Sequence, residues 1–268
     1  MMDTMEAFDT QPVLLERDGM IAIVTLNNPK KRNALTLDAW RALTDTIELL
    51  NDDDAVRCII IKGAGDKAFA AGADISEFPT VRANAEQAYV YGLVTDKALE
   101  VLLNCKHPTI AMIQGACTGG GLEIAACCDI RIAAESARFG VPIKRIGHAF
   151  APSEMKPVIE LVGKALVLEL LLEGRIMDAD EALVRGLVNR VVADANLGVE
   201  TGETADRIAE GAPLAARMTK RFVNRLVADP TPVSDAELRE SYAPCDSEDY
   251  REGFTAFLEK RPPTFKGR

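Results

Sequence analysis

The order of strand-like and helix-like segments in the first half of the chain constrains the fold more than any other feature. A hairpin pattern at 13–27, with Asp18-Gly19 as its turn, comes first. Buried-strand patterns at 56–61, 109–114 and 129–133 then alternate with helical patterns at 36–50, 83–103 and from about 119. This alternation is typical of an α/β protein with crossover connections.

The last part of the chain has a different pattern. Strand-like runs nearly vanish after residue 152, and helical patterns follow at 153–173, 178–185, 197–210, 213–228, 234–242 and 246–260. We therefore expect an α/β core over residues 1–200 and a helical C-terminal region over residues 201–268.

Composition excludes several classes of partner. The 268 residues include 31 Lys and Arg against 41 Asp and Glu, a net charge of −10. This balance argues against a nucleic-acid backbone or an anionic membrane surface as the main partner, but a few local cations still suffice to hold an anionic cofactor. No apolar run approaches the ~18 residues of a membrane span.

Two further features predict a cytoplasmic protein. The opening segment, MMDTMEAFDT, is acidic and lacks the basic-then-apolar order of a signal peptide. The six cysteines form no C-x-x-C and occur mostly in apolar runs, which indicates reduced, buried thiols.

Several common catalytic and cofactor motifs are absent. The sequence has no G-x-x-x-x-G-K-[ST] phosphate loop, no G-x-G-x-x-G dinucleotide motif and no G-x-S-x-G nucleophile motif. With only two histidines, His107 and His148, a His-rich metal site is excluded, and we predict no metal.

Two segments rich in small residues are candidates for chemistry. AAGAD at 70–74 follows the strand at 56–61, and GGGLE at 119–123 follows the strand at 109–114. The first N–H groups of a helix lack partners within the helix, so one amide from each segment can together hold a single oxyanion. Glu123, one turn into the second helix, is then placed to act as acid or base.

The same residues have plainer interpretations. Glycines after a strand are often only turn residues, and a glutamate in a first helical turn often only complements the helix dipole. Cys127-Cys128 fits a core position better than a catalytic one, and His107 fits a loop. His148, in a Gly-containing loop, stays open.

Five segments resemble the enoyl-CoA hydratase/isomerase (crotonase) superfamily in their order and spacing: NPKKRNAL (28–35), KAFAAGADISEF (67–78), HPTIAMIQGACTGGGLEIAACCDIRIAAESARFGVP (107–142), GRIMDADEALVRGLVNRVV (174–192) and EGFTAFLEKRPPTFKGR (252–268). The resemblance implies a crotonase-like spiral of ββα units with a helical C-terminal region that builds a trimer, often a hexamer.

The resemblance also implies a function. The core would bind an acyl-CoA thioester, with the N–H groups of Ala73 and Gly120 holding the thioester oxygen as it gains enolate charge and Glu123 as acid or base. Coenzyme A would enter as part of the substrate, with no permanently bound cofactor. The positions matching CoA-binding residues are Lys31, Arg32, Ala34, Ala71, Asp74, Ile75 and Lys260, the last often acting across a subunit boundary.

One departure from the family puts simple hydration in question. Hydratases of the family use a second glutamate after F-G-x-P, where this chain has Ile143. Lys144, His148 and Glu154 are the nearby candidates for a substitute proton carrier. The resemblance points first to enoyl-CoA hydration. Double-bond isomerisation, a lyase or hydrolase reaction on a substituted acyl-CoA, and non-catalytic acyl-CoA binding remain as alternatives.

Overall fold

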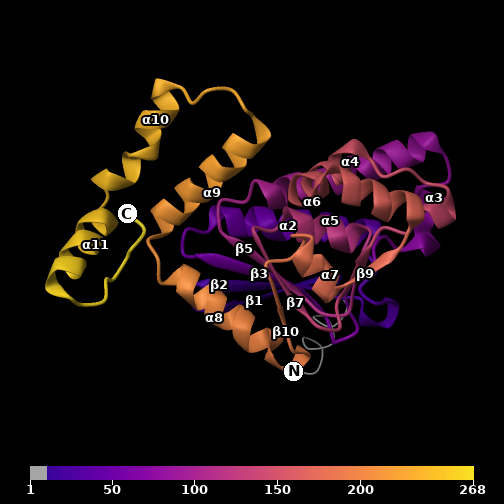
Figure 1. Ribbon diagram of the computed structural model, residues 1–268, viewed down its shortest axis with the longest axis horizontal. Helices are drawn as coiled ribbons and strands as arrows, with labels where there is room; N and C mark the ends of the chain where they lie inside the picture. Colours follow the sequence, from indigo (N-terminus) through magenta and orange to yellow (C-terminus); the bar gives the residue numbers. More distant parts are fainter. Residues whose placement is uncertain (1–10) are drawn as a thin grey trace.

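A computed structural model describes residues 11–268, so the acidic segment 1–10 lies outside the described residues. The larger of its two sheets has the order β1-β2-β3-β5-β7-β10 (Figure 1). All neighbours in it are parallel except the β1–β2 hairpin. Its strands are β1 (Val13–Asp18), β2 (Ile21–Leu26), β3 (Cys58–Gly63), β5 (Thr109–Ile113), β7 (Ile130–Ala134) and β10 (Arg190–Val192).

A second sheet, with the order β4-β6-β8-β9, is built from strands of three residues. These are β4 (Ala68–Ala70), β6 (Ala116–Thr118), β8 (Arg138–Gly140) and β9 (Ile176–Asp178). The pattern of the sequence did not predict them, because three residues are too few to show a strand period. The crossovers that leave β3, β5 and β7 therefore run from a long strand to a short strand and then to a helix, which is a repeated ββα unit.

The helices agree closely with the predicted segments. They are α2 (Leu37–Asp52), α3 (Phe78–Val81), α4 (Ala85–Leu103), α5 (Gly120–Cys127), α6 (Pro152–Glu173), α7 (Ala179–Val184), α8 (Leu197–Ala209), α9 (Pro213–Ala228), α10 (Asp235–Ser241) and α11 (Glu248–Glu259). Short 3-10 turns are η1 (Pro29–Lys31), η2 (Ile75–Glu77), η3 (Ile143–Ile146), η4 (Asp194–Asn196) and η5 (Ala243–Asp246).

Single residues determine where α2 begins and where α6 is broken. Thr36 caps α2 as expected, since its hydroxyl accepts the N–H of Ala39 at 3.1 Å. The predicted helix over 153–173 is broken at Gly163, where φ is +74°. Glycine adopts this left-handed conformation without strain, so α6 consists of two helical pieces.

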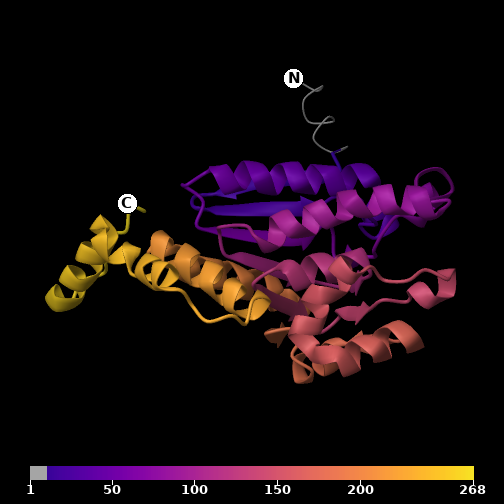
Figure 2. The same cartoon turned by 90° about the horizontal axis from the view of Figure 1, so that it is seen from above.

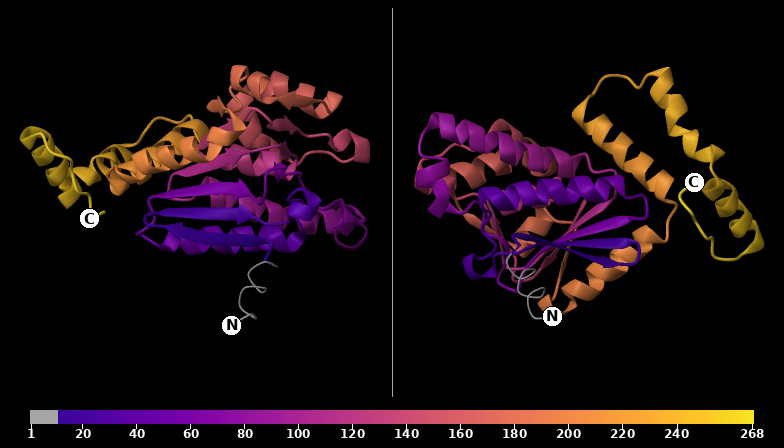
Figure 3. Two further views of the ribbon diagram at one scale, coloured as in Figure 1. Left: turned by 90° about the horizontal axis from the view of Figure 1, so that it is seen from below. Right: turned by 180° about the vertical axis from the view of Figure 1, so that it is seen from behind.

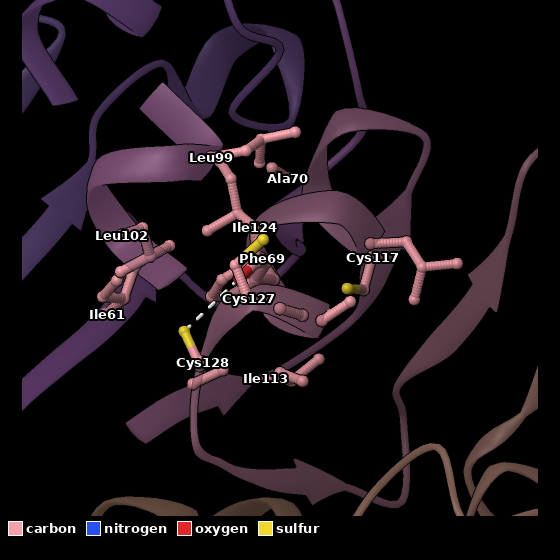
Figure 4. Close-up of a cluster of buried hydrophobic side chains, with 14 of the residues drawn as sticks. Ile61, Phe69, Ala70, Leu99, Leu102, Ile113, Cys117, Ile124, Cys127 and Cys128 are labelled. Carbon is pink, nitrogen blue, oxygen red and sulfur yellow. Dashed lines mark hydrogen bonds between the residues drawn. The ribbon is translucent and has the colours of Figure 1, made fainter. Parts of the chain in front are cut away.

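The main core lies where α2, α4 and α5 pack against the sheets, with Trp40, Phe69 and Phe139 fully buried. Figure 4 shows part of it around α5. Cys127 and Cys128 lie in this core, as expected, and the Cys128 thiol donates to the carbonyl oxygen of Ile124 at 3.4 Å. Burial raises the pKa of the Cys128 thiol to about 12, so it stays protonated and packs as an apolar group.

The helices after β10 divide into two groups. α8 packs on the opposite face of the larger sheet, where Leu197, Ala205 and Ala209 are buried. α9, α10 and α11 extend to one side of the core (Figures 1, 2 and 3). The expected boundary at residue 200 falls inside α8, so we propose that the helical C-terminal region begins after Ala209. Within residues 11–268, no helix is long and apolar enough to cross a membrane.

Candidate active site

The two segments rich in small residues meet in space. They directly follow β4 and β6, which are parallel neighbours, and not the longer strands 56–61 and 109–114 that the sequence indicated. The Thr118 hydroxyl donates to the Ala71 carbonyl oxygen at 3.1 Å and so joins the two segments. A Cβ atom on Gly72 would lie 3.0 Å from the Thr118 carbonyl oxygen, so glycine permits the close approach.

The backbone N–H groups of Ala73 and Gly120 at this junction have no acceptor among the described residues, and neither do those of Gly72 and Gly121 beside them. The neighbouring N–H groups of Ala71, Asp74 and Gly119 donate to the carbonyl oxygens of Arg32, Leu35 and Gly140. Gly120 is the first residue of α5, where N–H groups lack partners within the helix. The junction therefore presents unused donors from both segments, among them the N–H groups of Ala73 and Gly120, which is the arrangement expected of an oxyanion hole.

The side chains of Trp40 and Leu35 pack directly against Gly120. A Cβ atom at this position would lie 2.7 Å from Cζ2 of Trp40 and 3.1 Å from Cδ1 of Leu35, so no larger residue fits. The Trp40 indole N–H donates to the Tyr91 hydroxyl at 3.2 Å, which fixes the indole. The position of the Gly120 N–H thus depends on contact with a buried aromatic ring.

Glu123 lies one turn further along α5, with 5% of its surface exposed. Its carboxyl group has no hydrogen-bond partner in the part of the chain that the structure describes. Burial raises the pKa of Glu123 well above its usual value, and the charge of Glu154 adds to the rise, while Arg82 opposes it. The carboxyl group is therefore suited to holding and giving a proton.

Three residues that the sequence did not single out surround this carboxyl group: Arg82, Tyr91 and Asp96. The Arg82 guanidinium lies over the rings of Phe78 and Tyr91, 5.1 and 4.9 Å from their centres. Burial raises the pKa of Tyr91 to about 12, so the phenol is neutral. No sequence signal identified these residues, because Arg82, at the end of α3, and Tyr91 and Asp96, on α4, come near Glu123 only through tertiary packing.

Most of the expected CoA residues form one surface. Residues 31–34 run beside 71–74, joined by the Leu35–Ala73 bridge. The Lys31 ammonium donates to Asp74 Oδ2 at 2.6 Å and to the Ser76 hydroxyl at 2.9 Å. Burial of Asp74 alone would raise its pKa, but the hydrogen bonds from Lys31 and Ser76 outweigh burial and lower the pKa. Lys31 is therefore a cation already fixed by a carboxylate.

The other expected CoA residues have different exposures. Arg32 adopts a left-handed conformation (φ +54°), and its side chain is exposed and has no partner among residues 11–268. Ala34 and Ala71 are half-buried, whereas 55% of Ile75 is exposed. Arg32 is thus the free cation of this surface.

Comparison with known proteins places this chain in a family. The model of the family described as enoyl-CoA hydratase/isomerase matches residues 16–268. The chain belongs to the enoyl-CoA hydratase/isomerase (crotonase) family. Its fold, with ββα units and a helical C-terminal region, matches solved members.

Several relatives are similar over nearly their whole length. A short-chain-enoyl-CoA hydratase of Clostridium acetobutylicum is 37% identical over 93% of this chain and 95% of its own. A crotonyl-CoA hydratase of Syntrophomonas wolfei is 36% identical over 94% of this chain and 97% of its own. The crystal structure of an enoyl-CoA hydratase/carnithine racemase from Magnetospirillum magneticum has a TM-score of 0.94, with 53% identity and 96% of each chain covered.

The family's second carboxylate is absent at residue 143, and the three substitute candidates lie in different places. Ile143 packs against the main core, and the Lys144 side chain lies beside Gly174 at the end of α6. His148 Nε2 contacts Arg82, and burial together with the Arg82 charge lowers the pKa of His148. Glu154 is the candidate that is buried and electrostatically linked to Glu123.

Lys260 lies apart from the other expected CoA residues. It is exposed at the end of α11, at the opposite end of the molecule from α3, which closely follows Ile75 (Figure 1). Within one chain, Lys260 therefore does not lie near the surface formed by residues 31–34 and 71–75, where the other expected CoA residues are.

A cavity of about 1150 Å³ also lies away from Ala73, Gly120 and Glu123. It is lined by the ends of α5 and β7 on the core side and by α9 on the other, including Cys128, Ile130 and Met218. We therefore identify the catalytic site by its chemistry and not by cavity size. In the described residues 11–268, no group of three or more His, Cys, Asp or Glu side chains is arranged to hold a metal ion.

Proposed function

We propose that this enzyme adds water to the double bond of short-chain 2-enoyl-CoA thioesters. The observation that supports this most is the pair of unpartnered N–H groups, Ala73 and Gly120, one helical turn from the buried carboxyl group of Glu123. The names of two relatives, a short-chain-enoyl-CoA hydratase and a crotonyl-CoA hydratase, support the same reaction and acyl length.

The site would act on the thioester oxygen. As water adds to C3, electrons move from the double bond onto this oxygen, and the resulting enolate accepts hydrogen bonds from Ala73 and Gly120. Such donors, fixed before the reaction, contribute roughly 3 kcal/mol each. Glu123, whose pKa is raised by burial, then gives a proton to C2, and the proton that the water loses on bonding to C3 passes to a base of the site.

We propose that the CoA moiety binds along residues 31–34 and 71–75. Arg32 would reach a phosphate group, and Lys31, fixed by Asp74, would add a second positive charge. Ala34, Ala71 and Ile75 would contact the nucleotide and pantetheine. In this account CoA is part of the substrate, and no separate cofactor takes part.

We also propose that copies of this chain associate as a trimer or hexamer through the C-terminal helices. α11 exposes Phe254, Phe257 and Leu258, with 83% of Phe257 accessible. A neighbouring copy would cover this face and bring its own Lys260 to the CoA surface. Light scattering after size-exclusion chromatography should then give three or six times the mass of the chain, and a monomer would contradict it.

The cysteines support cytoplasm as the compartment. All six are free thiols, and five of them are buried. Reduced thiols of this kind are typical of a reducing compartment.

Absorbance of the conjugated thioester tests the proposed reaction. Crotonyl-CoA mixed with the purified protein should lose its ultraviolet band, and mass spectrometry should find a product heavier by one water. Longer 2-enoyl-CoA chains should react more slowly. Binding without any loss of the band would contradict hydration, and a moved double bond at unchanged mass would identify an isomerase.

A further inference from the structure

We propose that Glu154, at the start of α6, is the second catalytic carboxylate of this enzyme and does the work that Ile143 cannot do. The proposal rests on the proposed function, because it assigns a residue to the hydration step. Position 154 lies eleven residues after the position where the family has its usual glutamate.

The first observation is the burial and bonding of the Glu154 carboxyl group. Only 6% of the residue is exposed. Its Oε2 accepts the N–H of Ala151 at 2.7 Å, and its other oxygen has no partner among the described residues. This second oxygen is not among the fully buried polar atoms that lack a partner, so it is open to a polar ligand such as water.

The second observation is that Glu154 and Glu123 share one environment. α5 and α6 pack against each other, and each helix contributes one buried carboxyl group near its N-terminus. The charge of Arg82 favours ionisation of both, and the charge of Asp96 opposes it. The other two titratable groups nearby, Tyr91 and His148, both have pKa values shifted toward their neutral forms.

Unequal hydrogen bonding separates the roles of the two carboxyl groups. Burial raises the pKa of both, but Glu154 receives an N–H hydrogen bond at the positive end of α6, which favours its ionised form. Glu123 receives no hydrogen bond and keeps its proton more readily. A pair that shares one proton is therefore ionised at Glu154 and protonated at Glu123.

The hydration step then balances. Glu154 takes a proton from water, whose oxygen bonds to C3, and the C2=C3 electrons move onto the thioester oxygen at Ala73 and Gly120. As the enolate collapses, Glu123 gives its proton to C2. Glu154 now holds the proton that Glu123 has lost, and transfer of this proton between the two groups restores the starting state.

A purely structural role for Glu154 predicts a different result from the same variant. In Glu154→Gln the amide oxygen still accepts the Ala151 N–H, so the helix cap is kept while the base is lost. Glu173→Gln is the matched control, because Glu173 is an exposed residue at the other end of the same helix. If Glu154 had a purely structural role, Glu154→Gln and Glu173→Gln would both keep their activity.

The test compares two reactions of each variant. Hydration of crotonyl-CoA needs both carboxylates, whereas exchange of the C2 proton of butyryl-CoA with D2O needs only Glu123 and the two N–H groups. We expect Glu154→Gln to lose about 10²- to 10⁴-fold in kcat for hydration while its exchange rate stays at or above that of wild type, because loss of the Glu154 charge favours the ionised form of Glu123 that removes the C2 proton. Glu173→Gln should keep both activities.

Each other outcome would overturn the proposal. Hydration by Glu154→Gln at more than half the wild-type kcat would show that Glu154 is not needed. Loss of hydration and exchange together would show that the substitution disturbs the whole site although glutamine keeps the Ala151 cap, and would overturn a role of Glu154 in the hydration step alone. If the wild-type protein does not hydrate crotonyl-CoA but exchanges the C2 proton of butyryl-CoA, the proposed function fails separately.

Discussion

A Cβ atom on Gly72 would lie 3.5 Å from the amide nitrogen of Gly120, so these two residues fix how closely the end of β4 approaches the start of α5. Gly72 also has φ +95°, which a residue with a side chain rarely adopts. The spacing of the two donors of the site, on Ala73 and Gly120, therefore depends on this backbone contact as well as on the Trp40 ring beneath Gly120.

Gly120→Ala should impair catalysis by displacing its N–H. The added methyl group meets the Trp40 ring at 2.7 Å, and the start of α5 must shift. We expect a loss of about 10²-fold in kcat and about 1–3 kcal/mol in stability, measured by steady-state kinetics and urea unfolding. Gly202→Ala in α8, where nothing lies within 4 Å, should keep wild-type kcat. Unchanged kcat in Gly120→Ala would exclude its N–H from the reaction.

Glu123→Gln should make the protein more stable above neutral pH. Burial raises the pKa of Glu123 from its usual 4.5, so the folded protein holds this proton more tightly than the unfolded chain does. Wild-type stability therefore falls as pH rises through the folded pKa, and the glutamine variant escapes this loss. Thermal unfolding should show a higher Tm for the variant at about pH 8 and no difference at about pH 4. A lower Tm at the higher pH would contradict this view of the buried carboxyl group.

Arg32→Asn should weaken CoA binding without changing the chemical step. Asparagine tolerates the left-handed backbone at this position, so the substitution removes the charge with little strain. We expect KM for crotonyl-CoA to rise about tenfold at low salt with kcat unchanged, and the difference to shrink as salt increases. An unchanged KM at low salt would place the phosphates elsewhere.

His107 should make the protein sensitive to acid. Burial first, and then the charge of Arg217, lower the pKa of His107 to about 4. The folded state thus binds fewer protons than the unfolded chain between about pH 6.5 and 4, and stability is lost as pH falls through this range.

Comparison with His107→Gln measures this contribution. Wild type should lose about 3 kcal/mol more than the variant between about pH 7 and 4, as measured by urea unfolding at each pH. Equal losses would show that His107 is protonated in the folded state at little cost.

Much of the fold was predictable from the sequence because its long elements have clear periods. The α2 cap at Thr36 and the strand before Gly63 follow from local signals. The short strands β4 and β6 do not, since three residues show no period, and their pairing is what brings Ala73 to Gly120. The break at Gly163 also escaped prediction, because glycine is tolerated inside helices.

The residues of the candidate site also differ in whether the sequence could predict them. The segments 70–74 and 119–123, with Glu123, stand out in the sequence because small residues and a carboxylate follow strand ends, and the resemblance to the family singled out Ala73 and Gly120 within them. Arg82 and Tyr91 had no such signal, because they join the site only through tertiary packing. Among Lys144, His148 and Glu154 the sequence left the choice open, since it gives no burial and no direction of side chains. The structure places Lys144 beside Gly174 and buries Glu154.

Hydration of crotonyl-CoA in D2O by the wild type and Glu123→Gln tests the central claim most directly. The wild type should form 3-hydroxybutyryl-CoA with one deuterium at C2, and the variant should be slower by about 10³-fold, because the group that protonates C2 is missing. Product formed by Glu123→Gln at the wild-type rate would contradict the account.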